Sequence, residues 1–248
     1  MALLKLGNAL ADAGDDPKAE ACYREALAIN LDTAFVQLPF NFGNVLAGWI
    51  PRRMGVPIHS RVVGSNQNDI LTRFFETRSM VADTVVPTLS PRMDIQVSSN
   101  FERLLFEMND RDGGVTAEQL QRFRSMGRLD VETDQFERWI APVFRAARFD
   151  DSETLRIIGE VRSATGEIID PHTAVGIGAA RRHRSPGIPM VTTLTAHAAK
   201  FPDAVEQATG SRPALPPHLA DLLERPERTQ TLPNDLGAVQ RFVESVAR

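Results

Sequence analysis

The sequence predicts an α/β fold that is preceded by an α-helical hairpin. From about residue 34 onward, short apolar runs rich in β-branched residues alternate with segments of helical period. Before that point, two short amphipathic patterns flank a turn. With 248 residues, of which 42% are apolar, the chain is long enough to bury a core. We therefore expect two domains, residues 1–33 and residues 34–248.

The amino-terminal hairpin resembles one tetratricopeptide repeat. In such a repeat, small residues let two helices approach closely and larger side chains fill the space between them. The matching positions are Leu3, Leu6, Gly7, Leu10, Ala19, Tyr23 and Ala26. A single unit leaves apolar faces uncovered, because arrays need about three units to bury a continuous core. One possible function is therefore a non-catalytic interaction protein that uses this hairpin.

The second domain opens on a strand pattern and contains several helical patterns. Runs of β-branched residues predict strands at 57–64 and 188–194. The helical period predicts helices over 99–108, 116–126, 133–147, 152–164 and 172–183. Asp170 and Pro171 suit the N-cap and the first position of the last of these. The proline-rich tail is expected to pack as extended material around short helices at 217–223 and 234–247.

Composition disfavours several classes of function. The 28 basic and 32 acidic residues give a net charge of −4, which provides no electrostatic surface for nucleic acid. No apolar stretch is long enough for a membrane helix and no cleavable signal is evident, so we expect a cytoplasmic protein without membrane contact. Cys22 is the single cysteine, and the five histidines show no metal-ligand spacing. We expect no disulfide within the chain and no metal site.

Four ordered segments resemble threonine synthase, a family of pyridoxal-phosphate enzymes, over about residues 40–248. They are Asn41–Gly48 with Met54–Pro57, Ser65–Asp69, Thr88–Ile95 running into Ser98–Arg103, and Thr195–Pro202. The resemblance implies part of a fold like that of the tryptophan synthase β subunit (fold type II), with a helical insertion. It also implies the family reaction, in which O-phosphohomoserine and water give threonine and phosphate. Pyridoxal phosphate is the cofactor that the family uses to stabilise carbanions.

The resemblance assigns the cofactor-phosphate loop to Asn41, Phe42, Gly43 and Asn44. Backbone N–H groups that open a helix attract an anion, and glycine permits close approach. Phe40 stands where the family has the first glycine of this loop, and a bulky side chain there could close the site. Taken alone, these residues would be interpreted as an ordinary helix start.

The resemblance also places Thr195 at the pyridine nitrogen of the cofactor, although a threonine at a strand end can equally satisfy local backbone. Ser98, Ser99, Asn100 and Arg103 suit a substrate phosphate, and a helix cap with a surface arginine is the equal alternative. His197 is interpreted as a structural residue. The polar side chains after the first strand are expected to cap the following helix; they are Asn66, Asn68 and Asp69.

In the enzymes of this family, the lysine that forms a Schiff base with the cofactor lies in the amino-terminal half of the chain. Only three of the 28 basic residues here are lysines, namely Lys5, Lys18 and Lys200, and none lies at a matching position. No catalytic residue can therefore be named, and cofactor binding by these 248 residues alone is doubtful. We expect a truncated or fused threonine synthase that is inactive alone. A complementing amino-terminal half, or self-association, could cover the apolar surface that half an enzyme exposes.

Overall fold

The computed structural model describes residues 34–37, 42–56 and 58–247. The predicted hairpin over residues 1–33 lies outside the described residues, as do Phe40 and Asn41. The chain divides into two compact units, with the boundary between Pro213 and Ala214. The first unit carries a mixed α/β fold, as the sequence predicts.

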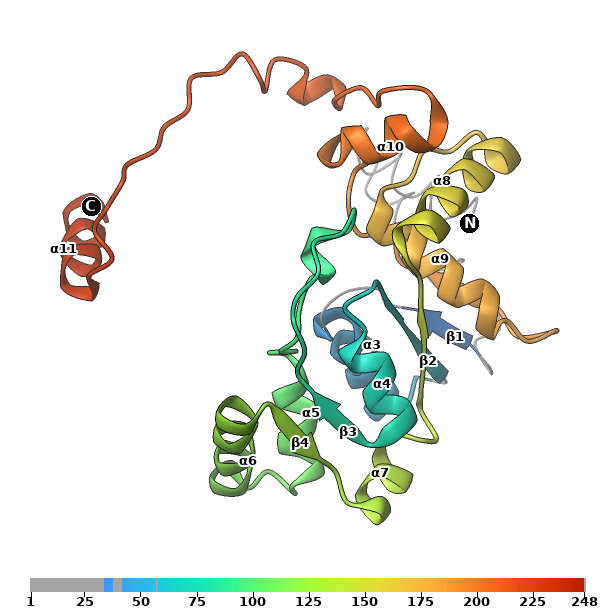
Figure 1. Ribbon diagram of the computed structural model, residues 1–248, viewed down its shortest axis with the longest axis vertical. Helices are drawn as coiled ribbons and strands as arrows, with labels where there is room; N and C mark the ends of the chain where they lie inside the picture. The colour runs from blue at the N-terminus through green and yellow to red at the C-terminus, as the bar shows by residue number, and fades with distance from the viewer. Residues whose placement is uncertain (1–33, 38–41, 57, 248) are drawn as a thin grey trace. The chain divides into compact units, whose positions relative to one another are not determined.

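The first unit contains both sheets of the described chain (Figure 1). Its elements are β1 (Ala34–Gln37), α3 (Gly43–Arg53), β2 (Ile58–Ser65), α4 (Ile70–Thr77), β3 (Ser79–Val81), η2 (Pro91–Met93), α5 (Phe101–Met108), α6 (Gly113–Met126), β4 (Arg128–Asp130), α7 (Thr133–Trp139), β5 (Phe144–Arg148), α8 (Asp151–Thr165), α9 (Pro171–His183), β6 (Met190–Thr192), η3 (Ala198–Lys200) and α10 (Pro202–Thr209). The second unit contains η4 (Pro217–Leu219) and α11 (Leu236–Val246).

The main sheet has the strand order β5-β2-β1-β6, and all its neighbouring strands are parallel. Parallel strands need crossover connections, which helices provide here. A second, two-stranded sheet pairs β3 and β4 in antiparallel fashion. Because the main sheet is parallel throughout, all its strands end at one edge.

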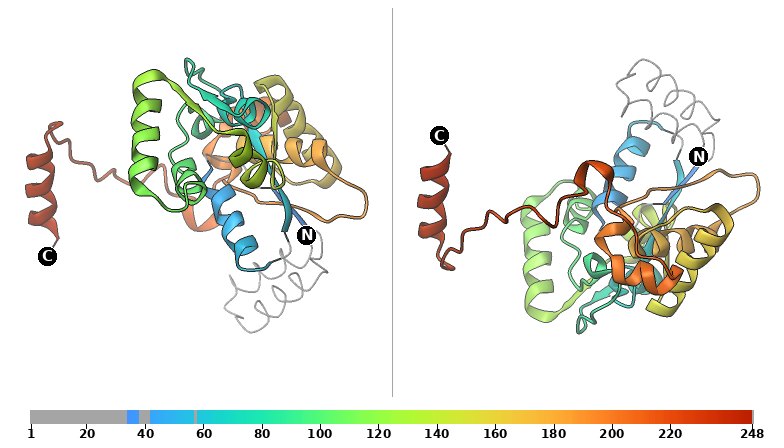
Figure 2. Two further views of the ribbon diagram at one scale, coloured as in Figure 1. Left: turned by 90° about the horizontal axis from the view of Figure 1, so that it is seen from below. Right: turned by 90° about the horizontal axis from the view of Figure 1, so that it is seen from above.

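Helices cover both faces of the main sheet, and each face has its own core. Val63 of β2 packs with residues of α3, α4 and α5, whereas its neighbour Val62 packs with residues of α8 and α9. Successive side chains of a strand point to opposite faces, so β2 contributes to both cores. Helices α8 and α9 lie side by side (Figure 2). Helices α5, α6 and α7 gather around the β3–β4 ribbon (Figure 1).

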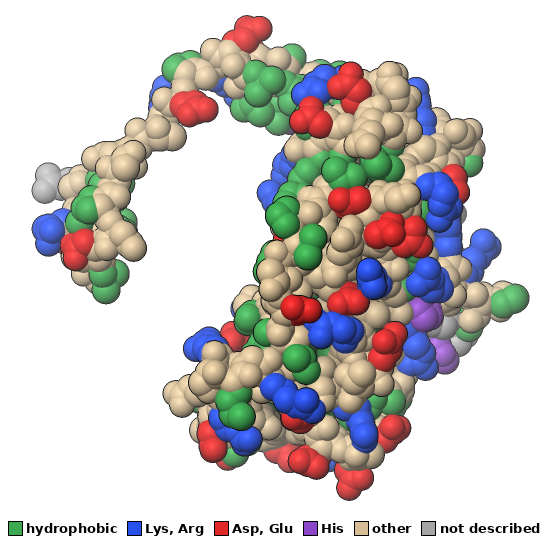
Figure 3. Space-filling model, viewed as in Figure 1, with side chains coloured by type: hydrophobic (Ala, Val, Ile, Leu, Met, Phe, Trp, Pro, Cys, Tyr) green, Lys and Arg blue, Asp and Glu red, His purple; other side chains and the backbone are tan. Residues whose placement is uncertain are grey.

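The surface agrees with the near balance of charge in the composition. Basic and acidic side chains are interspersed on the face shown in Figure 3. Among the described residues, every helix falls short of the length and apolar character that crossing a membrane requires.

Two helix starts follow from local chemistry. Asp150 accepts a hydrogen bond from the backbone N–H of Glu153 at 2.8 Å, and Glu153 binds back to the N–H of Asp150 at 3.0 Å. This capping box fixes the start of α8. Asp170 accepts from the N–H of His172 at 2.9 Å with Pro171 in the first turn, which confirms the predicted start of α9.

The predicted helix over 133–147 is wrong in its second half. Helix α7 ends at Trp139, and residues 144–148 form strand β5 instead. Pro142 explains the stop, because proline cannot continue the hydrogen-bond ladder of a helix and disfavours the α region for the residue before it. Strand β5 then pairs with β2 along its whole length. The helical period therefore concealed a half-buried edge strand.

The tail also differs from its prediction. Residues 214–248 are assigned to a unit of their own, and the stretch between Leu219 and Leu236 forms neither helix nor strand. The predicted helix at 217–223 shrinks to a single 3-10 turn at Pro217–Leu219. The predicted final helix is confirmed as α11, which Asp235 caps by accepting from the N–H of Ala238 at 2.7 Å.

Strand β2 carries a buried arginine that is only partly satisfied. Arg61 is fully buried, and its Nη2 donates to the carbonyl of Gly48 at 2.6 Å. Its Nε and Nη1 atoms have no hydrogen-bond partner among the described residues, and the Phe144 ring lies 5.7 Å from its guanidinium carbon. Burial lowers the pKa of Arg61 to about 9, and the positive charge of Arg52 adds to this effect. The side chain remains protonated at neutral pH and is a source of instability.

Replacing this arginine by an apolar side chain of similar length should stabilise the protein. We expect Arg61→Met to raise the free energy of unfolding at pH 7 by about 1–3 kcal/mol, because an unpaired buried cation is removed. Urea unfolding measures the change. The control Arg145→Met alters an exposed arginine on the neighbouring strand and should shift stability by less than about 0.5 kcal/mol. A destabilised Arg61→Met variant would contradict the interpretation.

Candidate functional site

The candidate site lies at the carboxyl edge of the main sheet. In the register of the sheet, Gln37 at the end of β1 lies beside Thr192 at the end of β6. The chain that leaves β1 enters α3 at Gly43, and the chain that leaves β6 reaches Thr195. Ligands of open parallel α/β sheets bind at this edge. The fold therefore brings the predicted phosphate loop and Thr195 to neighbouring strand ends.

Phe42 initiates α3 in an unusual backbone conformation. Its φ of 47° and ψ of −12° lie in the left-handed region, which non-glycine residues rarely adopt. Its ring is fully buried, with ring centroids 5.2 Å from Phe101 and 5.7 Å from Phe144. The Phe42 side chain therefore belongs to the core, and only its backbone can face a ligand. Asn41 and Phe40 lie outside the described residues, so the effect of Phe40 on this loop stays a prediction.

Gly43 occupies a crowded position at the start of α3, where any side chain would require a neighbouring group to move. A Cβ atom at this position would lie 3.1 Å from Nδ2 of Asn100. The first N–H groups of a helix have no partner within the helix and carry partial positive charge. Asn44 follows in the same turn and contributes its backbone. The helix start thus offers donors to an anion, with the Asn100 amide beside them.

The predicted substrate residues gather at the start of α5. Asn100 occupies the N-cap position without a side-chain cap hydrogen bond, and its Oδ1 accepts from Nη1 of Arg103 at 2.9 Å. Ser99 is exposed. Ser98 is 6% exposed, and its Oγ has no hydrogen-bond partner within the part of the chain that the structure describes. A buried hydroxyl without a partner is costly, and a ligand oxygen would satisfy it.

A residue of α9 fixes the backbone of Thr195 by a hydrogen bond. Its backbone N–H donates to Oγ1 of Thr173 at 3.3 Å, and the two hydroxyl oxygens are 3.5 Å apart. The Thr173 hydroxyl in turn donates to the Asp170 carboxylate. Because the proton of Thr173 is committed to Asp170, Thr173 can only accept from Thr195. The proton of the half-buried Thr195 hydroxyl therefore serves this weak 3.5 Å contact, and the hydroxyl would have to rotate away from Thr173 to donate toward the carboxyl edge.

A buried aspartate–histidine pair underlies this arrangement, and the sequence analysis missed it. Nδ1 of His172 lies 2.8 Å from Oδ1 of Asp170, and both side chains are completely buried. Nε2 of His172 accepts from the backbone N–H of Arg92 at 3.3 Å. These contacts assign the proton of a neutral imidazole to Nδ1. The signal available in the sequence was the Asp-Pro-His start of α9, which was interpreted only as a cap.

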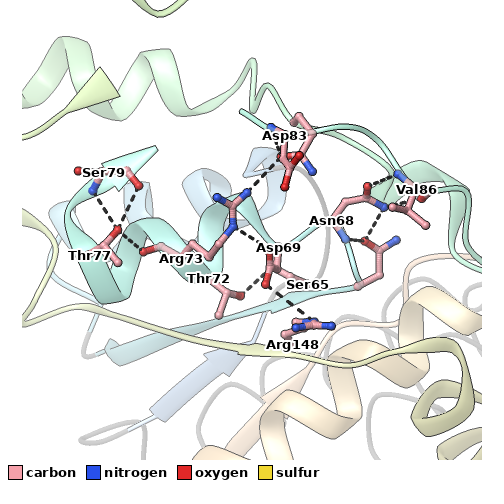
Figure 4. A network of polar contacts seen from close by, with 12 residues as sticks. Ser65, Asn68, Asp69, Thr72, Arg73, Thr77, Ser79, Asp83, Val86 and Arg148 are labelled. Atoms are coloured by element: carbon pink, nitrogen blue, oxygen red, sulfur yellow. Dashed lines mark hydrogen bonds and ion pairs between the residues drawn. The ribbon is translucent and has the colours of Figure 1, made fainter. Parts of the chain in front are cut away.

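The polar side chains after β2 serve the structure rather than a helix cap. Asn66 and Asn68 each donate through Nδ2 to Oδ1 of Asp94, at 2.7 and 3.0 Å. Asn68 also exchanges two hydrogen bonds of 2.8 Å with the backbone of Val86 (Figure 4). Asp69 occupies the N-cap position of α4, but its carboxylate makes no cap hydrogen bond. The expectation of capping is therefore wrong, and the amides instead fasten the segment 83–96 to the sheet.

The remaining predicted groups have simple roles. His197 accepts from the N–H of Ala199 at 3.1 Å and caps η3, which confirms its interpretation as a structural residue. Lys200 is exposed at the end of η3. Within the described chain, no group of three metal-ligating side chains converges.

The carboxyl edge fits a phosphate-bearing aromatic cofactor. The start of α3, with its free backbone donors and Gly43, suits the phosphate. The orphan hydroxyl of Ser98 supplies a further donor in a buried position. Thr195, one strand away, offers a neutral hydroxyl to a ring nitrogen. The positive charge of Arg103 lies beside Asn100 and could receive a second anion.

These features define a class, that of α/β proteins with a parallel sheet, in which the carboxyl edge is the usual place for a ligand. Comparison with known proteins specifies the class further. The family described as "Threonine synthase, C-terminal" matches residues 173–243. Threonine synthase from Pseudomonas aeruginosa is 50% identical over 207 residues, which are 82% of this chain and 44% of that protein.

Solved structures agree with the sequence comparison. The crystal structure of pyridoxal-phosphate-bound threonine synthase from Brucella melitensis matches with a TM-score of 0.80 and 39% identity, and covers 92% of this chain and 48% of that one. Yeast threonine synthase matches with a TM-score of 0.77 and 29% identity, and covers 92% of this chain and 51% of that one. The chain thus resembles the carboxyl-terminal part of threonine synthases and spans about half the length of these relatives.

Removing the buried carboxylate of Asp170 should destabilise the fold strongly. We expect Asp170→Ala to cost about 3–5 kcal/mol, because His172 and Thr173 lose their acceptor while remaining buried. Urea unfolding measures the loss. Asp112→Ala is the matched control, since Asp112 is an exposed N-cap that binds only the start of α6, and should cost about 1 kcal/mol. Equal losses in the two variants would show that Asp170 is merely a cap.

Proposed function

We propose that this chain supplies the carboxyl-terminal half of a threonine synthase site. In this proposal the substrate is O-phosphohomoserine and the products are threonine and phosphate. The observation that carries the proposal is the meeting of the α3 start, Asn100 and Thr195 at one sheet edge, in a chain that is 50% identical to a threonine synthase. Pyridoxal phosphate, when bound, would supply the electron sink for the chemistry at the substrate's α- and β-carbons.

The residues of this chain would bind and orient. The N–H groups of residues 42–44 would hold the cofactor phosphate, and Gly43 would permit its close approach. Thr195 would donate its hydroxyl proton to the ring nitrogen and keep that nitrogen uncharged, with its position fixed by Thr173. Arg103 and Ser98 would hold the phosphate of the substrate, which becomes the leaving group.

The proposed reaction also needs an amine that moves protons, and these 248 residues do not supply it. Lys200 is exposed at η3, and the other lysines lie in the segment 1–33. We therefore propose that a polypeptide like the amino-terminal half of threonine synthase completes the site. Apolar side chains near the carboxyl edge suit such a partner, because Val85, Val86, Val97 and Leu194 are between 44% and 67% exposed. Association of two copies of this chain is the other way to cover them.

Complementation tests the proposed function. The purified chain alone, given pyridoxal phosphate and O-phosphohomoserine, should release no phosphate above background. Co-expression with the amino-terminal half of the Pseudomonas aeruginosa enzyme should restore phosphate release and the absorbance of the bound cofactor.

A control for the complementation experiment distinguishes the contributions of the two halves to turnover. Replacing the cofactor-binding lysine in the added half should abolish turnover. Robust turnover by the chain alone would overturn the lysine argument. A stable complex that neither binds the cofactor nor turns over would overturn the proposed site.

We also propose, from the repeat-like spacing described above, that residues 1–33 form a helical hairpin that binds a partner helix or peptide. Pull-down experiments with the intact chain and with a chain lacking residues 1–33 test this role. We expect the deletion, and also Tyr23→Ala, to remove at least one bound partner, because Tyr23 would fill the space between the two helices. If every partner remained after the deletion, the hairpin would have no such function.

A further inference from the structure

A pocket at the other end of α3 has no place in the proposed reaction. It has a volume of about 350 Å³ and is lined by Arg53, Glu107, Asp110, Arg111, Arg138 and Trp139. These residues come from the carboxyl ends of α3, α5 and α7 and from the turn after α5. Gly43 opens α3 and Arg53 closes it, so the pocket lies about 15 Å along the helix from the candidate cofactor site.

Two arginines in this pocket are held by aromatic rings rather than by carboxylates. The guanidinium carbon of Arg53 lies 5.5 Å from the ring centroid of Trp49 and 5.7 Å from that of Trp139. The guanidinium carbon of Arg138 lies 5.6 Å from the Trp139 centroid. In the described part of the chain, neither arginine forms an ion pair with a carboxylate.

A cation over an aromatic ring is attracted to the ring without using its N–H donors in conventional hydrogen bonds. Arg53 and Arg138 therefore keep donors for a ligand, and both guanidinium carbons lie within 6 Å of the same ring centroid. The third arginine, Arg111, binds Glu107 through Nε at 3.0 Å, which leaves its terminal amino groups for a ligand. Bidentate recognition of this kind is typical of phosphate sites.

The pocket combines a net positive charge with an unusual backbone turn. Its three arginines and two carboxylates give a net charge of +1. Asp110 and Arg111 both adopt positive φ values, 52° and 65°, which are uncommon for non-glycine residues and are often found at ligand sites. This turn places the Asp110 carboxylate on the pocket wall, and no side-chain hydrogen bond or ion pair occupies it among the described residues.

We propose that this pocket binds a phosphate monoester of a small hydroxyl-bearing molecule. The phosphate would bridge Arg53 and Arg138, with Arg111 as a third donor. A hydroxyl of the ligand would donate to Asp110, and the carbon skeleton would pack against the half-buried indole of Trp139. A volume of 350 Å³ is within the range of small-molecule sites and accommodates a sugar phosphate.

The two tryptophans of the chain, Trp49 and Trp139, are both in contact with Arg53, so intrinsic fluorescence reports on this pocket alone. We expect ribose 5-phosphate to change the fluorescence with saturation, inorganic phosphate to bind about tenfold more weakly, and ribose to have no effect. Isothermal titration calorimetry on the full chain gives the dissociation constants independently of the fluorophores.

Variants test whether ribose 5-phosphate binds in this pocket. Arg53→Gln and Arg138→Gln should each weaken ribose 5-phosphate binding about tenfold or more, and Asp110→Asn should remove its advantage over inorganic phosphate. Arg184→Gln is the matched control, because Arg184 is an exposed arginine beyond α9 and outside the pocket. Thermal unfolding verifies that each variant folds. Absence of saturable binding, equal affinities for both phosphates, or unchanged affinity in the two arginine variants would overturn the proposal.

Discussion

The buried carboxylate of Asp170 joins parts of the chain that lie far apart in sequence. It accepts hydrogen bonds from the backbone and Nδ1 of His172 and from the hydroxyl of Thr173. His172 then holds the backbone of Arg92, and Thr173 holds that of Thr195. A carboxyl group buried at this depth needs such donors, because a buried oxygen without a hydrogen bond is costly. One fully hydrogen-bonded side chain therefore sets both the start of α9 and the position of a side chain at the candidate site.

Neutral amide side chains order the same edge of the sheet near the end of β2. Asn66 and Asn68 leave β2 and share Oδ1 of Asp94, which fastens the segment 83–96 across the ends of the strands. Polar groups at this edge are thus largely satisfied by one another, and the exceptions stand out. The Ser98 hydroxyl is buried and unpaired, and α3 opens without a side-chain cap. Both exceptions lie in segments that carry the resemblance to threonine synthase, so the unsatisfied groups and the resemblance draw attention to the same part of the sheet edge.

Much of the fold followed from local signals in the sequence. The cap at Asp170 is a chemical feature of a single turn, and the structure confirms the helix that it starts. The structure also confirms the final helix, which was predicted from its helical period. Strand β5 was missed because its pattern continues that of α7, and only its pairing with β2 distinguishes the two. Arg61 could not be anticipated either. Arg61 lies two residues after the exposed His59 on β2, where the strand period gives both the same face, and its burial depends on the packing of α3.

The candidate site was predictable to the extent that it consists of neighbouring residues. The loop at Gly43, the cluster at Asn100 and Thr195 were named from the resemblance, and the parallel pairing of β1 with β6 explains why the first and last lie at one edge. The contacts that position them join distant segments, so no local pattern contains them. Helix α3 connects this edge to the arginine-lined pocket at its other end. The proposed cofactor loop and the arginine-lined pocket therefore lie at opposite ends of one helix, and the residues of α3 between them serve the core of the sheet rather than either site.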